Sequence, residues 1–150
     1  MAPALRSKCP IRLAFIDRRT DVDNLGVIGN RAVVYPDFSA WFSRQLRTHL
    51  RAEESTLDSP KLLVELTQAY METNRSTLSF NIVAKVSEQE INGAPIRVYR
   101  GATTKMNWFG GDGETGAYVE RATKDLLAKL SAAEDKLVAL LRAIDFALLR

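Results

Sequence analysis

Leu78-Ser79-Phe80-Asn81-Ile82-Val83-Ala84-Lys85-Val86 is the stretch that decides the fold. Large apolar residues and Ala84 occupy every second position, and their neighbours are polar or small. Side chains alternate between the two faces of a β-strand, so this spacing puts the apolar set on a single face. We therefore predict a strand over 78–86 that packs one face against a hydrophobic core.

Two further segments alternate in the same way on either side of this stretch. They cover 62–71 and 96–99, and the links contain Asn74-Arg75-Ser76 and Asn92-Gly93. Short links with turn-forming residues favour hairpins between consecutive strands. The three segments are therefore predicted to form an antiparallel meander.

The N-terminal part of the chain predicts one strand, one loop and one helix. Ile11–Asp17 is apolar enough for a strand with both faces partly buried, and the Asp-, Asn- and Gly-rich residues 18–30 are typical of a loop. Pro36-Asp37 then opens a helix, with Asp37 expected as its N-cap. Apolar residues follow at helical spacing: Phe38, Trp41, Phe42, Leu46 and Leu50.

From Thr115 to the C-terminus, apolar residues recur three or four positions apart, which predicts helix with Thr115 as N-cap. Ser131 followed by Glu134 matches a capping box, so a break into two helices near Ser131 is an alternative. The helical stretch is longer than a four-stranded sheet needs for cover. Its C-terminal surplus, with Leu141 and Leu148, is therefore the predicted place of self-association or partner docking.

The predicted fold class is α+β, in one domain that covers 1–150 with 1–9 as a tail. The expected order is strand, helix, three strands, helix, giving a mixed four-stranded sheet with the helices packed on it. A right-handed crossover through the first helix would make the first strand parallel to a neighbour.

Charge provides little evidence for a nucleic-acid partner. The net charge is +3, the pI is about 9.2, and Lys and Arg are interleaved with Asp and Glu. The predicted helix carries a basic stripe made of Arg44, Arg47 and Arg51. This stripe is typical of a solvated helix face. As an alternative, it would give the protein the function of a cytoplasmic anion-binding or nucleic-acid-binding module.

No motif in the chain supports an enzyme, a cofactor or a metal. His49 is the only histidine, in a helix where we expect it to be half-exposed, and Cys9 is the only cysteine. Residues 111–116 spell G-x-G-x-x-G, but no strand follows the next helix, so a loop is the better interpretation. Residues 21–26 look like the first half of a calcium loop, yet Leu25 stands at the fifth position, and turn chemistry explains them better.

Trp108 and Phe109 lie between the last predicted strand and the glycine-rich run. Aromatic residues at a strand end usually cap the core, and exposed aromatic residues in a loop are typical partner anchors. Both interpretations stay open, and these two residues join Leu141 and Leu148 as predicted partner contacts.

The order of elements, together with a few short motifs, resembles a known family. These features are Ile11–Asp17 followed by Arg18, then Leu25-Gly26, a helix ending in Leu46 and Leu50, and three long strands before a C-terminal helix. They resemble the YajG-type family of small bacterial envelope lipoproteins, whose topology is similar to that of auxiliary lipoproteins of ABC-type lipid transport. The resemblance implies a non-enzymatic, periplasm-facing accessory domain that binds a protein or a lipid, and it implies no catalytic residue.

Export signals do not decide the location. No apolar run approaches the roughly 18 residues of a membrane span, and the residues before Ile11 have no apolar signal-peptide core. Arg6-Ser7-Lys8 also lacks the small and apolar residues expected before a lipidated Cys9. The expected location is therefore periplasmic and anchored to the outer membrane if a lipidated leader has been removed, and otherwise cytoplasmic.

Overall fold

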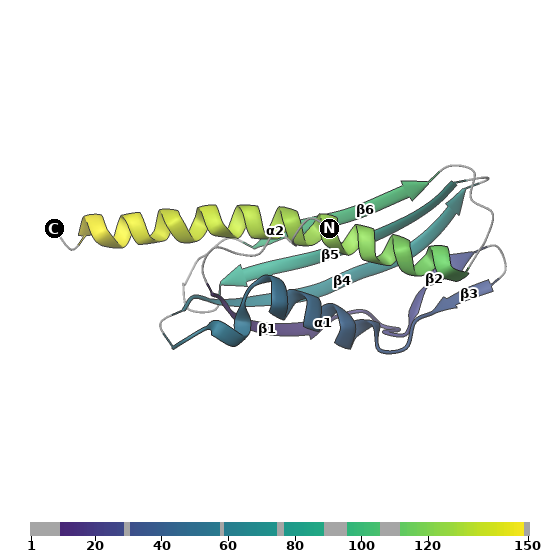
Figure 1. Ribbon diagram of the computed structural model, residues 1–150, viewed down its shortest axis with the longest axis horizontal. Coiled ribbons are helices and arrows are strands. Elements are labelled where there is room, and N and C mark those ends of the chain that lie inside the picture. Colours follow the sequence, from purple (N-terminus) through teal and green to yellow (C-terminus); the bar gives the residue numbers. More distant parts are fainter. Residues whose placement is uncertain are drawn as a thin grey trace.

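The structure, a computed structural model, describes residues 10–28, 31–57, 59–74, 77–88, 96–105 and 112–148; in the last range, side chains are described for 116–135. Figure 1 shows a sheet with two helices on one side of it, which confirms the predicted α+β class. The elements in chain order are β1 (Arg12–Asp17), β2 (Asn24–Ile28), β3 (Arg31–Val34), α1 (Phe38–His49), η1 (Ala52–Glu54), β4 (Lys61–Asn74), β5 (Thr77–Glu88), β6 (Arg97–Lys105) and α2 (Asp112–Leu148).

The sheet is six-stranded, with the order β3-β2-β4-β5-β6 and β1 also paired with β4. The antiparallel meander of β4, β5 and β6 and the parallel pairing of β1 with β4 confirm two predictions. Because β5 takes one edge of β4, β1 and β2 share the other edge, with β1 beside residues 61–66 and β2 beside Met71. The predicted count of four strands was wrong, because β2 forms within residues 18–30, which were expected to be a loop, and β3 forms between that segment and α1, where no element was predicted.

Gly26 explains why the composition of residues 18–30 predicted a loop in place of β2, and why β2 can pair with β4. Gly26 has φ 110°, and a Cβ there would lie 2.5 Å from the carbonyl oxygen of Met71. Glycine alone accepts this backbone conformation without strain, so the residue that suggested a loop is the one that lets two backbones meet. Neighbouring Leu25 is fully buried and ties β2 to the core.

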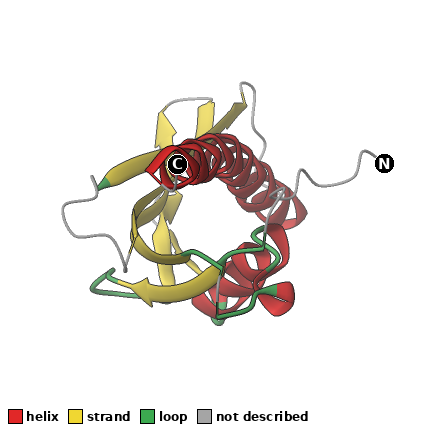
Figure 2. Cartoon of the chain, turned by 90° about the vertical axis from the view of Figure 1, so that its left-hand side faces the viewer, coloured by secondary structure: helices red, strands yellow, loops and turns green. Residues whose placement is uncertain are grey.

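The core lies between the sheet and the two helices. Figure 2 shows the sheet curving around one side of the molecule while the helices close the other. The predicted alternation in β5 is confirmed, because Leu78, Phe80, Ile82, Ala84 and Val86 are fully buried. The fully buried side chains of α1 are Phe38, Phe42 and Leu46. The rings of Phe38 and Phe80 pack edge to face, with their centres 6.3 Å apart.

Of the two predicted N-caps, Asp37 was confirmed in position only and Thr115 was wrong, and the alternative break near Ser131 does not occur. Asp37 stands at the N-cap of α1 but has φ 66° and makes no side-chain capping bond. Helix α2 begins at Asp112, ahead of the expected cap Thr115, and it runs through Ser131 without a break. Glu134 does not cap a helix, because its carboxylate is fully buried and binds Arg97 and Tyr99 on β6.

Helix α2 lies unusually close to β6. A Cβ on Gly101 would stand 2.2 Å from the carbonyl oxygen of Ala122 and 2.7 Å from Cβ of Leu126. Glycine at this position therefore lets the helix backbone rest almost directly on the strand. This close approach sets the position of α2 on the sheet.

Candidate functional site

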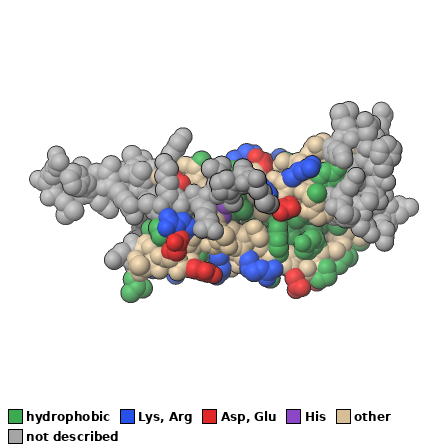
Figure 3. Space-filling model, in the orientation of Figure 1, with side chains coloured by type: hydrophobic (Ala, Val, Ile, Leu, Met, Phe, Trp, Pro, Cys, Tyr) green, Lys and Arg blue, Asp and Glu red, His purple; other side chains and the backbone are tan. Residues whose placement is uncertain are grey.

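The arginine residues predicted for anion binding do not gather around a cavity in the described part of the chain. Arg44 and Arg47 are exposed on α1. Arg51 follows the helix with φ 57°, and its Nη2 donates to Glu54 Oε1 at 3.3 Å. On the face seen in Figure 3, basic side chains lie scattered among acidic ones and do not form a stripe.

The other predicted site residues lie on α2 or outside the described part of the chain. Trp108 and Phe109 fall outside the described residues. Leu141 and Leu148 belong to the C-terminal turns of α2. His49 was expected to be half-exposed, but it is only 6% exposed, because the last turn of α1 packs into the core.

A polar groove lies where β1 leaves the edge of β4 and β2 joins it. Within the described sheet, residues 67–70 of β4 have no strand beside them on this edge, since β1 pairs up to Leu66 and β2 pairs at Met71. The groove has a volume of about 360 Å³. It is lined by Arg18, Arg19, Thr20, Asp21, Asn24 and Gly26 on one side and by Thr67, Gln68, Ala69 and Tyr70 on the other.

An irregularity in β4 shapes one wall of the groove. The register between β4 and β5 shifts between Leu66 and Gln68, so Thr67 has no Cα partner on β5. The Thr67 hydroxyl instead donates to the carbonyl oxygen of Val83 at 3.1 Å. Such bulges redirect side chains, and here Gln68 is left exposed beside the groove.

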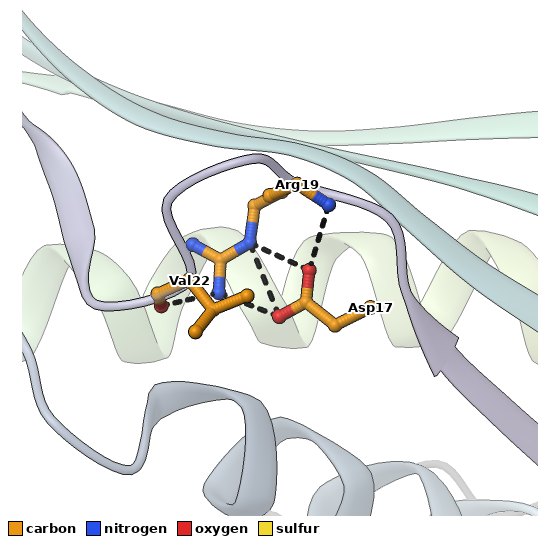
Figure 4. Close-up of polar contacts among 3 residues, drawn as sticks. All are labelled: Asp17, Arg19 and Val22. Carbon is orange, nitrogen blue, oxygen red and sulfur yellow. Dashed lines mark hydrogen bonds and ion pairs between the residues drawn. The ribbon is translucent and has the colours of Figure 1, made fainter.

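A buried ion pair holds the loop that forms the opposite wall (Figure 4). Arg19 Nη2 lies 2.7 Å from Asp17 Oδ2 and donates to the Val22 carbonyl at 2.7 Å, and the backbone N–H of Arg19 donates to Asp17 Oδ1. The two side chains are only 6% and 8% exposed, and the guanidinium lies 5.1 Å from the centre of the Phe38 ring. Arg19 thus contacts the end of β1, the loop between β1 and β2, and α1.

The same contacts set the ionisation of Asp17. Burial alone would raise the pKa of its carboxyl, but the hydrogen bonds and the charge of Arg19 outweigh burial and hold that pKa below its ordinary value. The ion pair is therefore charged at neutral pH, and the loop is pre-formed. Sequence reasoning missed this pair, although the charged run at the end of a strand, Asp17-Arg18-Arg19, was the available signal.

A second polar cluster lies where α2 reaches the end of the sheet. Arg97 binds Glu134 through Nε at 2.7 Å and Nη2 at 2.9 Å, and the Tyr99 hydroxyl donates to Glu134 at 3.0 Å. Burial, followed by the charge and hydrogen bond of Glu134, raises the pKa of Tyr99 to about 12. Burial and then the negative charge of Glu134 also raise the pKa of Glu88, whose Oε1 is buried without a hydrogen-bond partner among the described residues.

Helix α2 also covers the outer edge of the sheet. The backbone N–H of Ala102 donates to Asp125 at 3.1 Å, and Lys129 donates to the Arg100 carbonyl at 2.9 Å. Asp125 and Lys129 are themselves paired at 3.0 Å. Part of the open edge of β6 is thereby closed to a further strand.

Beyond Glu134, α2 continues past the end of the sheet (Figure 1). The remaining residues up to Leu148 extend the helix by about 21 Å at 1.5 Å per residue. In the sequence, every residue from 136 to 148 is apolar except Lys136, Arg142 and Asp145. Across the described residues, no helix has the length and hydropathy needed to cross a membrane.

Comparison with known proteins gives only remote structural similarity. No protein-family model matches the chain, and no curated protein is significantly similar to it. A proposed lipoprotein from Caulobacter crescentus superposes with a TM-score of 0.47 at 10% identity, over 67% of this chain and 83% of that one. A minor lipoprotein from Acinetobacter baumannii gives a TM-score of 0.43 at 11% identity, over 89% and 92% of the two chains.

Proposed function

We propose that this chain is a non-enzymatic binding domain of the bacterial cell envelope that docks to a protein partner through residues 136–148 of α2. The observation that carries the proposal is the continuation of α2 beyond the sheet with an almost entirely apolar sequence. Burying one leucine contributes about 1.5–3 kcal/mol, so a helix rich in leucine gains much from a partner.

The direction of this helix is fixed by the polar cluster at its exit. The bidentate contact between Arg97 and Glu134 sets the rotation of α2 at the last turn above the sheet. A segment that is already helical loses less conformational entropy when it binds than one that must fold on its partner. This favours docking as a preformed element.

A protein fits this segment better than a lipid does. The part beyond the sheet is shorter than the roughly 20 residues that cross a bilayer. A helix that lies on a membrane surface carries a polar face rich in Lys and Arg, whereas Lys136 and Arg142 are the basic residues here and Asp145 offsets one of them. The envelope location rests on the family resemblance described for the sequence.

Site-specific photo-crosslinking in the source bacterium tests the docking. A crosslinking residue at Leu141 is expected to give a discrete protein adduct, and the same residue at Glu120, exposed on the part of α2 above the sheet, serves as the matched control. Equal labelling at both positions, lipid adducts alone, or no adduct would contradict docking to a protein. Cell fractionation tests the location separately, since recovery only in the cytosol would remove the envelope assignment and leave the docking intact.

A further inference from the structure

We propose that the groove between the β1–β2 loop and β4 binds a neutral, hydroxyl-rich ligand, namely a sugar unit of a glycan. The groove lies along the edge of β4, between the places where β1 and β2 pair with it, and is separate from the segment of α2 proposed for docking. Its volume of about 360 Å³ falls within the range of roughly 300–1,000 Å³ typical of small-molecule sites.

Several lining side chains have hydrogen-bonding groups that the described protein does not use. Thr20, Asp21, Gln68 and Tyr70 line the groove, and no side-chain hydrogen bond occupies them in the described part of the chain. Together they supply donors and acceptors, because a hydroxyl and an amide do both and a carboxylate accepts. Sugar hydroxyls also donate and accept, so the two sets of groups match.

The charges around the groove do not favour an anion. Arg18 pairs with Glu65 at 3.1 Å, and Arg19 pairs with Asp17 at 2.7 Å. Each lining arginine therefore already has a carboxylate, and Asp21 adds a further negative charge. A phosphate would meet no excess positive charge, which distinguishes this groove from an anion site.

The lining also disfavours an acyl chain. Most of the lining side chains are polar, and covering them with a hydrocarbon would remove their hydration without giving them new partners. Tyr70 is the aromatic residue in the lining, and a phenol ring offers an apolar face together with a polar hydroxyl. That combination suits a sugar ring, which has both C–H surfaces and hydroxyls.

Both walls are held in place by the protein itself, so binding does not require them to become ordered. Arg19 fastens the loop, the Asn24 side chain accepts from the N–H of Gly26 at 2.8 Å, and Thr67 fixes the bulge. Arg19 Nη1 remains buried without an acceptor among the described residues, leaving one unused donor in a residue that lines the groove. Pre-formed walls lower the entropic cost of binding a small polar ligand.

Titrations of the ¹⁵N-labelled chain followed by NMR test the proposal, with maltotriose and chitotriose as probes and with inorganic phosphate and dodecanoate as comparison ligands. We expect amide shifts in 18–26 and 67–70 with at least one saccharide, at a Kd of about 1 mM. Gln68→Ala and Asp21→Ala should each weaken binding by about three- to tenfold, as expected for one lost hydrogen bond. Lys124→Ala, on an exposed side chain of α2, is the control and should bind as the wild type does.

The other outcomes overturn the proposal. Saccharide shifts that are unchanged in Gln68→Ala and Asp21→Ala would place the site elsewhere. A response only to phosphate would indicate an anion site, and a response only to dodecanoate would indicate a lipid site. No response to either saccharide would also overturn it, while crosslinking at Leu141 would still stand, so the two proposals fail independently.

Discussion

Gly101 controls how closely α2 can approach the sheet, and replacing it with alanine tests the packing directly. The new Cβ would lie 2.2 Å from the Ala122 carbonyl oxygen, 2.7 Å from Leu126 Cβ and 2.8 Å from Leu126 N. Two of these atoms belong to the helix backbone, so no side-chain rotation relieves the contact. The helix has to move away from β6 by about 1 Å to restore ordinary van der Waals distances.

The energetic effect follows from what that movement disturbs. Forcing one extra carbon into a packed interface costs about 1–3 kcal/mol. Movement of the helix also loosens fully buried Leu126 and the bond from Ala102 to Asp125, which adds to the loss. We expect Gly101→Ala to lower the free energy of unfolding by about 2–4 kcal/mol, a large part of the 5–15 kcal/mol of a typical domain.

Urea unfolding followed by circular dichroism measures this change, and Gly116→Ala provides the matched control. Gly116 lies in the same helix, and a Cβ there would meet nothing within 4 Å. Alanine should therefore raise the free energy of unfolding there by about 0.5–1 kcal/mol through helix propensity. A Gly101→Ala variant as stable as the wild type would refute the close packing of α2 on β6.

Two further predictions concern the polar cluster at the exit of α2. Glu134→Ala removes the buried carboxylate that accepts hydrogen bonds from the partly buried Arg97 and Tyr99 side chains, so thermal or urea unfolding should show a loss of about 3–5 kcal/mol in the free energy of unfolding. A loss below about 1 kcal/mol would show that the cluster does not anchor the helix. Glu88 has a raised pKa, so the folded state binds the proton of this carboxyl more tightly than the unfolded state does. The contribution of Glu88 to wild-type stability should therefore rise as the pH falls from 8 toward 4.5, the ordinary pKa of a glutamate. Glu88→Gln should be more stable than the wild type at pH 8, and the difference should shrink as pH falls; parallel pH profiles for the two proteins would contradict the buried, unpaired state of this carboxyl.

Periodicity along the chain determined the parts of the fold that depend on local pattern. The alternation in β5, the helical spacing of α1 and the short links of the meander each depend on residues close in sequence. The parallel pairing of β1 with β4 also followed, because a strand, a helix and a strand connect with one preferred hand. These features follow from the order in which apolar and polar side chains alternate along the chain, because folding buries the apolar ones.

The tertiary structure alone decided the features that depend on partners distant in sequence. The composition of residues 18–30 indicated a loop, yet β2 forms there because β4 offers an unoccupied stretch of edge that Gly26 can approach. The sequence pattern of a capping box includes Ser131 and Glu134. In the folded chain, however, the Glu134 carboxylate binds Arg97 and Tyr99, which lie more than thirty residues earlier in the sequence. The groove depends on a bulge and on the gap between two strands that share an edge, and neither leaves a periodic signal. A hydrophobic pattern indicates whether each residue is buried, but it does not indicate which distant residue it contacts. A hydrogen bond between distant residues, or a cavity, forms only when the chain folds and brings those segments together.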